Sequence, residues 1–272
     1  MSAIPRILVF DSGLGGLSVH HALCAQLPQA ETVYVADDAA FPYGALADPV
    51  LVERVRQVME RLIPDHAPDL VVIACNTAST LVLDDLRARF AVPFVGTVPA
   101  IKPAAEASQT KRIAILATPA TVKRDYTKAL IRSFAGDCDV ILHAPDLLAQ
   151  RAETVFAGGT VADRDLQADL APCFVDQDGR RTDVVVLGCT HYPLLLDRFQ
   201  VLAPWPVTWI DPAPAIARRA ASLLANQSDQ PDRSPKEHQH YFINTGSTSL
   251  FERLGGPLAK RGFTGGDCCV IP

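Results

Sequence analysis

Short apolar runs that end abruptly in polar residues recur along the chain. Residues 70–74 read Leu-Val-Val-Ile-Ala and stop at Cys75, and residues 184–188 read Val-Val-Val-Leu-Gly and stop at Cys189. Continuous apolar runs of this length are typical of strands that are buried on both faces, as in parallel sheets. The pattern therefore predicts two similar strands, each followed by a cysteine at its carboxyl end.

The remaining elements follow from the same pattern. Between residues 49 and 63, apolar side chains repeat at helical spacing while charged side chains occupy the positions between them, which predicts an amphipathic helix. Further strands are expected at 6–11, 32–36, 93–95, 112–118, 137–142, 206–210, 240–243 and 268–271, the last two as edge strands. Further helices are expected after residue 16, at 79–90, through 126 and 130, at 147–157 and at 216–224, and residues 226–237 are expected to form a surface loop.

The order of strands and helices starts again near residue 112, and the spacing from Asp11 to Cys75 is similar to that from Ala117 to Cys189. We therefore expect an α/β fold of two pseudo-symmetric domains, each with a mainly parallel sheet flanked by helices, and the active site between them. The expected domains are residues 1–97 with 212–272, and residues 98–211.

Composition narrows the class of protein. The 272 residues are 49% hydrophobic and carry a formal net charge of −5 without a basic cluster, which argues against a nucleic-acid partner. The apolar run at residues 7–10 is too short for a signal peptide or a membrane span, so we expect a cytoplasmic protein without a membrane partner. The seven cysteines are then expected to be free thiols.

Two cysteines at the carboxyl ends of parallel strands lie where open α/β sheets bind ligands. A thiol can act as acid or base near neutral pH, so Cys75 and Cys189 suit the inversion of an amino-acid α-carbon, which needs one such group on each face. Asp11 and His191 are candidates to assist Cys75 and Cys189 respectively. The alternatives are structural: a buried cysteine is often a core residue, His191 can cap its helix, and Asp11 can cap the turn at Gly13.

Four motifs carry a resemblance to a known family. They are Asp-Ser-Gly-Leu-Gly-Gly at 11–16, Pro-Tyr-Gly at 42–44, Cys-Asn-Thr-Ala-Ser at 75–79 and Gly-Cys-Thr-His-Tyr-Pro-Leu at 188–194. In this order and spacing they resemble the glutamate racemases of the aspartate/glutamate racemase superfamily, over nearly the whole chain.

The resemblance implies an isomerase without cofactor that interconverts L- and D-glutamate and supplies D-glutamate for peptidoglycan synthesis. Cys75 acts on the D-enantiomer and Cys189 on the L-enantiomer in this scheme, and members of the family commonly form homodimers. The positions that match the family's substrate-binding residues are Ser12, Tyr43, Gly44, Asn76, Thr77, Thr121 and Thr190.

Two positions depart from the family's pattern. A glutamate that helps the second cysteine usually follows a Cys-Pro pair, but here residues 143–145 read His-Ala-Pro, Ala152 stands at the nominal position and Glu153 comes one residue later. Glu153 is therefore the candidate assistant. Ala40 stands where an arginine often precedes the Pro-Tyr-Gly loop, which affects how that loop is anchored.

Several alternatives stay open. A cysteine hydrolase using Cys189 and His191, a racemase for aspartate or another amino acid, and a non-catalytic amino-acid-binding protein all fit parts of the pattern. A dinucleotide site fits poorly, because the third small residue of its fingerprint comes late and Asp11 would face the pyrophosphate. No metal site is expected, since His20 and His21 diverge on a helix and His238 and His240 lack neighbouring ligands in sequence.

Overall fold

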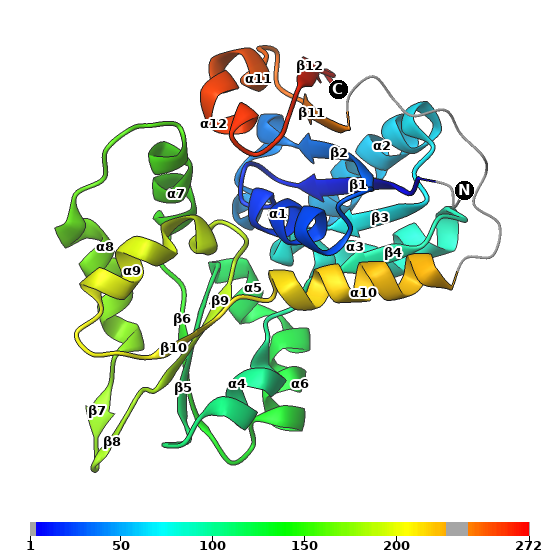
Figure 1. Ribbon diagram of the computed structural model, residues 1–272. Helices are drawn as coiled ribbons and strands as arrows, with labels where there is room; N and C mark the ends of the chain where they lie inside the picture. The colour runs from blue at the N-terminus through cyan, green and yellow to red at the C-terminus, as the bar shows by residue number, and fades with distance from the viewer. Residues whose placement is uncertain (1–3, 227–238, 272) are drawn as a thin grey trace. The chain divides into compact units, whose positions relative to one another are not determined.

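The computed structural model describes residues 4–226 and 239–271. The chain divides into two compact units: unit 1 is Met1–Thr97 with Ala213–Pro272, and unit 2 is Val98–Pro212. Each unit has its own sheet of parallel strands covered by helices, as predicted for an α/β protein (Figure 1). A surface loop was expected at residues 226–237, and its residues 227–237 lie outside the described part of the chain.

Unit 1 contains a six-stranded parallel sheet in the order β12-β11-β2-β1-β3-β4. Its strands are β1 (Arg6–Asp11), β2 (Glu31–Ala36), β3 (Leu70–Ile73), β4 (Phe94–Gly96), β11 (His240–Asn244) and β12 (Gly265–Cys268). Its helices are α1 (Leu17–Gln26), α2 (Asp48–His66), α3 (Asn76–Arg89), α10 (Ala213–Ala225), α11 (Leu250–Arg253) and α12 (Gly255–Ala259), with 3-10 turns η1 (Asp38–Ala40) and η2 (Tyr43–Ala45).

Alternation along the central strands decides which helices cover each face of this sheet. In β1, Leu8 and Phe10 pack with the apolar side chains of α2 and α3, whereas Ile7 and Val9 point to the other face. On that other face α1 and α10 lie against each other in front of the sheet (Figure 1). Helices on both faces bury the central strands completely, which explains their continuous apolar sequences.

Unit 2 contains a four-stranded parallel sheet in the order β10-β9-β5-β6 and a small antiparallel hairpin. Its strands are β5 (Arg112–Ala117), β6 (Asp139–His143), β9 (Val184–Gly188) and β10 (Thr208–Ile210), with β7 (Asp176–Gln177) and β8 (Arg180–Arg181) in the hairpin. Its helices are α4 (Ile101–Ala107), α5 (Pro119–Lys123), α6 (Asp125–Phe134), α7 (Leu148–Phe156), α8 (Asp163–Leu170) and α9 (Leu196–Leu202), with 3-10 turns η3 (Ala171–Cys173) and η4 (Tyr192–Leu195).

The core of unit 2 is also split by its sheet. Val185 and Leu187 of β9 pack with residues of α7, α8 and α9, while Val184 and Val186 pack with residues of α4. The two faces are therefore both apolar, and each strand residue of β9 is buried.

The two sheets share one strand order. Four neighbouring strands of unit 1 lie in the order β2-β1-β3-β4, and the four strands of unit 2 lie in the equivalent order β6-β5-β9-β10. In both sheets, the first of these strands in sequence lies between the second and the third. The chain therefore extends the sheet first on one side of that strand and then on the other, and the strand order reverses between the first and third strands. Such reversal points bind ligands at the carboxyl ends of the strands. Cys75 follows β3 and Cys189 follows β9, so the two cysteines occupy equivalent positions in the two units.

Two expectations about the strands of unit 1 were wrong. β11 is an interior strand that pairs with both β2 and β12, and the last strand is Gly265–Cys268 rather than 268–271. The helix expected through residues 126 and 130 is α6, and the short helix α5 precedes it, with Arg124 in an extended conformation between the two. Helices α8, α11 and α12 were not predicted because they are short and carry few apolar positions.

Candidate active site

In unit 1, the loops after β1 and β3 bring Ser12 and Cys75 together. Cys75 is the N-cap residue of α3, 5% exposed, and its thiol lies 3.8 Å from the Ser12 hydroxyl oxygen. Strand β1 pairs with β3 directly, and Ala74 donates a backbone hydrogen bond to Phe10 at 2.7 Å, so the ends of these strands are held in register. The Ser12 hydroxyl therefore lies beside the Cys75 thiol.

The first turn of α3 supplies polar groups beside the thiol. Asn76 and Thr77 are both buried, and the side-chain nitrogen of Asn76 makes no hydrogen bond within the described residues. A buried amide without a hydrogen bond costs about 1–3 kcal/mol. The α3 amino terminus also favours negative charge, so this turn suits a ligand with a carboxylate.

Asp11 is completely buried, and its carboxylate accepts a hydrogen bond from the Gly13 amide at 2.9 Å. The turn after it needs glycine at position 16, because a Cβ there would lie 2.7 Å from Asp11 Cβ and 3.1 Å from Ala74 Cβ. The turn-capping role expected as the structural alternative for Asp11 is therefore present. Its assistance to Cys75 stays a prediction.

The Pro-Tyr-Gly loop is anchored by a buried ionic network. Tyr43 donates a very short hydrogen bond to Asp37 at the end of β2, and Asp37 is fully buried. Arg54 of α2 binds the same carboxylate at 2.7 Å, and Thr245 donates to it at 2.5 Å. Burial, followed by the Asp37 charge, raises the pKa of Tyr43 well above its usual range. Arg54 thus anchors the Tyr43 loop through the Asp37 carboxylate.

The sequence pattern does not reveal this network, because its residues come from separate elements. Arg54 sits beside Val55 on the flank of the apolar stripe of α2, where a long side chain can reach back to the sheet. Gly44 follows Tyr43, and a Cβ there would meet no heavy atom within 4 Å, so the space at Gly44 is open.

Replacing Arg54 with methionine should destabilise unit 1 by about 3 kcal/mol, because the Asp37 carboxylate would stay buried without its cation. Urea-induced unfolding followed by fluorescence would measure the loss. Arg56→Met on the same helix is the matched control, since Arg56 forms its ion pairs with Glu53 and Glu60, which are both exposed. Equal stability of the two variants would contradict the structural role assigned to Arg54.

In unit 2, three side chains form a chain of contacts at the end of β9. The Cys189 sulfur lies 3.7 Å from His191 Nδ1, and His191 Nε2 lies 3.0 Å from the Glu153 carboxylate of α7. Cys189 and His191 are buried, whereas the Glu153 side chain is 24% exposed. A carboxylate that contacts one ring nitrogen orients the imidazole, so the other nitrogen faces the thiol and can exchange a proton with it.

Helix periodicity explains why Glu153, rather than residue 152, reaches His191. Ala152 points into the core with no exposed surface, where it packs with Leu148 and the sheet. One residue further along an α-helix turns the side chain by about 100°. The shifted glutamate therefore lies on the side of α7 that faces His191, and its assistance to Cys189 stays a prediction.

The loop after β5 provides the counterpart of the Asp11 turn. Thr118 caps α5 by accepting from the Thr121 amide at 3.2 Å, and the two threonine hydroxyls lie 2.9 Å apart. Thr121 and Thr190 are both buried. Tyr192 donates to the Ala117 carbonyl at 3.2 Å, and this contact ties the Cys189 loop to the end of β5.

Replacing Glu153 with glutamine should lower kcat/KM for the reaction proposed below by about 10–100-fold, because a hydrogen bond to a charged group contributes about 1.5–3 kcal/mol. Initial rates of the purified protein and its variant over a range of substrate concentrations would measure this change in kcat/KM. Glu106→Gln is the control, as Glu106 is an exposed glutamate of α4 in the same unit. Undiminished activity of Glu153→Gln would show that the contact with His191 has no part in turnover.

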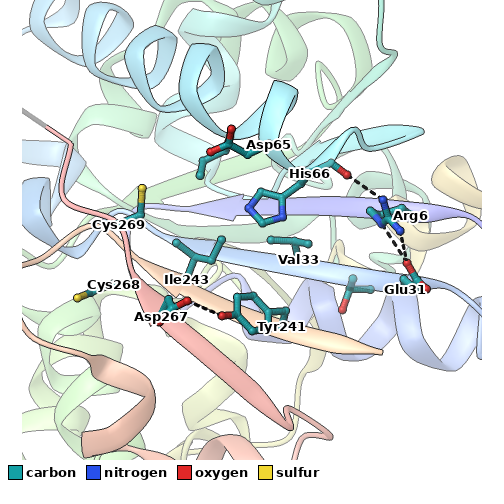
Figure 2. Close-up of a pocket in the computed structure, with 12 residues that line it drawn as sticks. Arg6, Glu31, Val33, Asp65, His66, Tyr241, Ile243, Asp267, Cys268 and Cys269 are labelled. Atoms are coloured by element: carbon teal, nitrogen blue, oxygen red, sulfur yellow. Dashed lines mark hydrogen bonds and ion pairs between the residues drawn. The ribbon is translucent and has the colours of Figure 1, made fainter. Parts of the chain in front are cut away.

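The structure also contains a cavity of about 540 Å³ in unit 1, lined by residues of β2, α2, β11 and β12. Figure 2 shows the Arg6–Glu31 ion pair at one end of it and Cys268 and Cys269 at the other. Its lining includes none of the predicted site residues. Polar groups at the strand ends, rather than cavity volume, therefore locate the candidate site.

In the part of the chain that the structure describes, we find no helix suited in length and polarity to cross a membrane.

Comparisons with known proteins agree with this arrangement. The sequence model of the Asp/Glu/Hydantoin racemase family matches residues 18–220. The chain is 53% identical over 236 residues to a glutamate racemase of Brucella anthropi, covering 86% of this chain and 83% of that protein. It is 52% identical over 229 residues to a glutamate racemase of Agrobacterium fabrum, covering 83% of this chain and 84% of that protein.

Solved structures give the same result. The crystal structure of Escherichia coli glutamate racemase, in complex with L-glutamate and the activator UDP-MurNAc-ala, superposes with a TM-score of 0.91 and 37% identity and covers 99% of both chains. Fold, sequence and the two strand-end cysteines thus lead to one assignment: the chain belongs to the Asp/Glu/Hydantoin racemase family, among its glutamate racemases.

Proposed function

We propose that this protein interconverts L- and D-glutamate without a cofactor, using Cys75 and Cys189 as the two acid/base groups. The observation that carries the proposal is the equivalent position of the two thiols, each after the third strand of a sheet with the same strand order. Inversion at a carbon needs one proton acceptor and one proton donor of similar strength on opposite faces. Two thiols in matched settings meet that need.

With L-glutamate, the Cys189 thiolate takes the α-proton and the Cys75 thiol delivers a proton to the opposite face. The product is D-glutamate, and the enzyme is left with a Cys189 thiol and a Cys75 thiolate. His191 holds the proton that Cys189 gives up before the next turnover, and Glu153 stabilises the resulting imidazolium. The reverse reaction starts at Cys75 with D-glutamate, and Asp11 is the proposed assistant there.

Substrate binding is proposed for polar residues around the two thiols. The buried side-chain nitrogen of Asn76, which makes no hydrogen bond within the described residues, suits a carboxylate of glutamate. The other proposed binding residues are Ser12, Tyr43, Gly44, Thr77, Thr121 and Thr190. The Tyr43 hydroxyl already donates to Asp37, so this side chain would accept a hydrogen bond from the substrate ammonium.

The proposal is tested by adding L-glutamate to the purified protein without cofactor and following its optical signal. The signal should decay to zero as the mixture becomes racemic, and D-glutamate should give the mirror curve. L-Aspartate should react more slowly, by about 10–200-fold, because a missing methylene changes binding by about 1–3 kcal/mol. A constant signal with both glutamate enantiomers would reject the function.

A cysteine hydrolase is the second candidate, because the Cys189–His191–Glu153 contacts also fit a nucleophile, its base and an orienting carboxylate. It gives no task to Cys75. The variant Cys75→Ala distinguishes the two functions. A racemase would lose its activity in this variant, whereas a hydrolase would still cleave an activated ester. Ester turnover that depends on Cys189 alone would favour the hydrolase.

We further propose that the reaction supplies D-glutamate for peptidoglycan synthesis in the cytoplasm, where free thiols such as the seven cysteines of this chain persist. The active form is proposed to be a homodimer. Sedimentation equilibrium should then give twice the mass of one chain, and a monomer mass at the concentration of the activity assay would contradict the dimer.

A further inference from the structure

Three side chains that commonly bind metals meet in unit 1, apart from the candidate active site. His20 and Cys24 lie one turn apart on α1, and His240 is the first residue of β11. Their ligand atoms all lie within 4.8 Å of one another. The Cys24 sulfur is 3.5 Å from His20 Nε2 and 3.8 Å from His240 Nε2. We refer to these residues as the His-Cys-His cluster.

Thr32 of β2 orients both rings of the cluster. Its hydroxyl oxygen lies 2.8 Å from His20 Nε2 and 2.9 Å from His240 Nδ1. In metal sites, a histidine ligand almost always uses its second ring nitrogen for a hydrogen bond of this kind, which fixes the ring and directs the first nitrogen to the ion. His240 has this arrangement, with Nδ1 on Thr32 and Nε2 toward the sulfur of Cys24.

The His-Cys-His cluster lies against buried aromatic side chains. His20 is 1% exposed and stacks on Phe263 at 4.5 Å between ring centroids. Cys24 and His240 are partly buried, so the three ligand atoms lie at the edge of the core of unit 1.

We propose that the cluster binds one Zn²⁺ through His20 Nε2, Cys24 Sγ and His240 Nε2, with water as the fourth ligand. Two imidazoles and one thiolate suit a borderline-soft ion, and the set offers no carboxylate for Mg²⁺ or Ca²⁺. Binding forms a zinc–sulfur bond and releases the Cys24 proton to solvent. His20 Nε2 exchanges its contact with Thr32 for the ion, and Thr32 continues to hold His240.

Such an ion would stabilise unit 1 by joining distant parts of the chain. Cys24 and His240 are 216 residues apart in sequence, and His240 belongs to the segment that returns to unit 1 after unit 2. A link across so long a loop restricts the unfolded chain, and a metal that binds only the folded state adds its binding free energy to stability. The inference is independent of the proposed racemase activity.

The test uses the full-length chain with Cys75→Ser and Cys189→Ser, so that the candidate active-site thiols cannot compete for metal. After chelator treatment and dialysis against buffered Zn²⁺, we expect one bound Zn²⁺ per chain, a higher thermal midpoint and release of one proton. In this background, Cys24→Ser and His240→Gln should each weaken binding by more than about 100-fold, and Thr32→Val by about 10–100-fold. Cys138→Ser, at a partly exposed thiol of unit 2, is the matched control and should change nothing.

Cobalt provides a readout that does not depend on the variants folding. Co²⁺ bound to the chain that carries only Cys75→Ser and Cys189→Ser should show a thiolate-to-cobalt charge-transfer band and the intense visible bands of a four-coordinate ion. Absence of bound metal, absence of the thiolate band, or unchanged zinc affinity in a folded Cys24→Ser variant would each overturn the proposal.

Discussion

Cys75→Ala and Cys189→Ala should each lower kcat for glutamate racemisation by at least about 10²–10⁴-fold, which is the usual contribution of a positioned acid or base. In every turnover one of the two groups accepts a proton and the other donates one, so neither can replace the other. Circular dichroism of the reaction mixture measures the rate in both directions.

Cys268→Ser is the control for this pair, because Cys268 is an exposed thiol at the end of β12. It should leave kcat unchanged. The two alanine substitutions remove small side chains that are 5% exposed, so melting curves should establish that both variants fold. Full turnover by either folded variant would end the two-thiol scheme.

His191→Asn should lower kcat/KM by about 10²-fold, because Cys189 loses the imidazole that lies 3.7 Å from its sulfur. The two enantiomers of glutamate have equal free energy in water, so the equilibrium constant is one for every variant. The fall in kcat/KM must therefore be the same in both directions, whereas the two kcat values are free to differ. Initial rates with each enantiomer across a range of pH measure these effects.

The double variant His191→Asn/Glu153→Gln tests whether the two side chains act together, which neither single substitution can show. If Glu153 acts through the imidazole, as its 3.0 Å contact indicates, Glu153→Gln should have little further effect in the His191→Asn background. His21→Asn, at an exposed histidine of α1, should leave activity unchanged. Multiplicative losses in the double variant would mean that the carboxylate acts independently of the histidine.

The central part of each sheet was predictable because its strands are buried on both faces. Continuous apolar runs in β1, β3, β5 and β9 can be read directly from the sequence, and each ends at a polar residue. The edge of unit 1 was not predictable in the same way. β12 reads Gly-Gly-Asp-Cys and is held by backbone pairing with β11, which a pattern of side chains does not reveal.

The candidate site was predictable where its residues follow strands or each other in sequence. Cys189 and His191 are two residues apart, so their contact was expected. The anchoring of Tyr43 by Asp37 and Arg54 depends on how α2 packs on the sheet, and no local pattern indicates it. The meeting of His20 and Cys24 with His240 likewise requires β11 to pair with β2. Only the spacing of His20 and Cys24, one helical turn apart, was visible in the sequence.

In the proposed mechanism, two separate groups exchange the α-proton with solvent. The most direct measurement follows L-glutamate and the wild-type protein in deuterated water and analyses both enantiomers by mass spectrometry before much substrate has reacted. Two thiols acting from opposite faces predict deuterium at the α-carbon of essentially all D-glutamate formed and almost none in the remaining L-glutamate. D-glutamate that retains the original proton would show that one group carries it across, and would contradict the account.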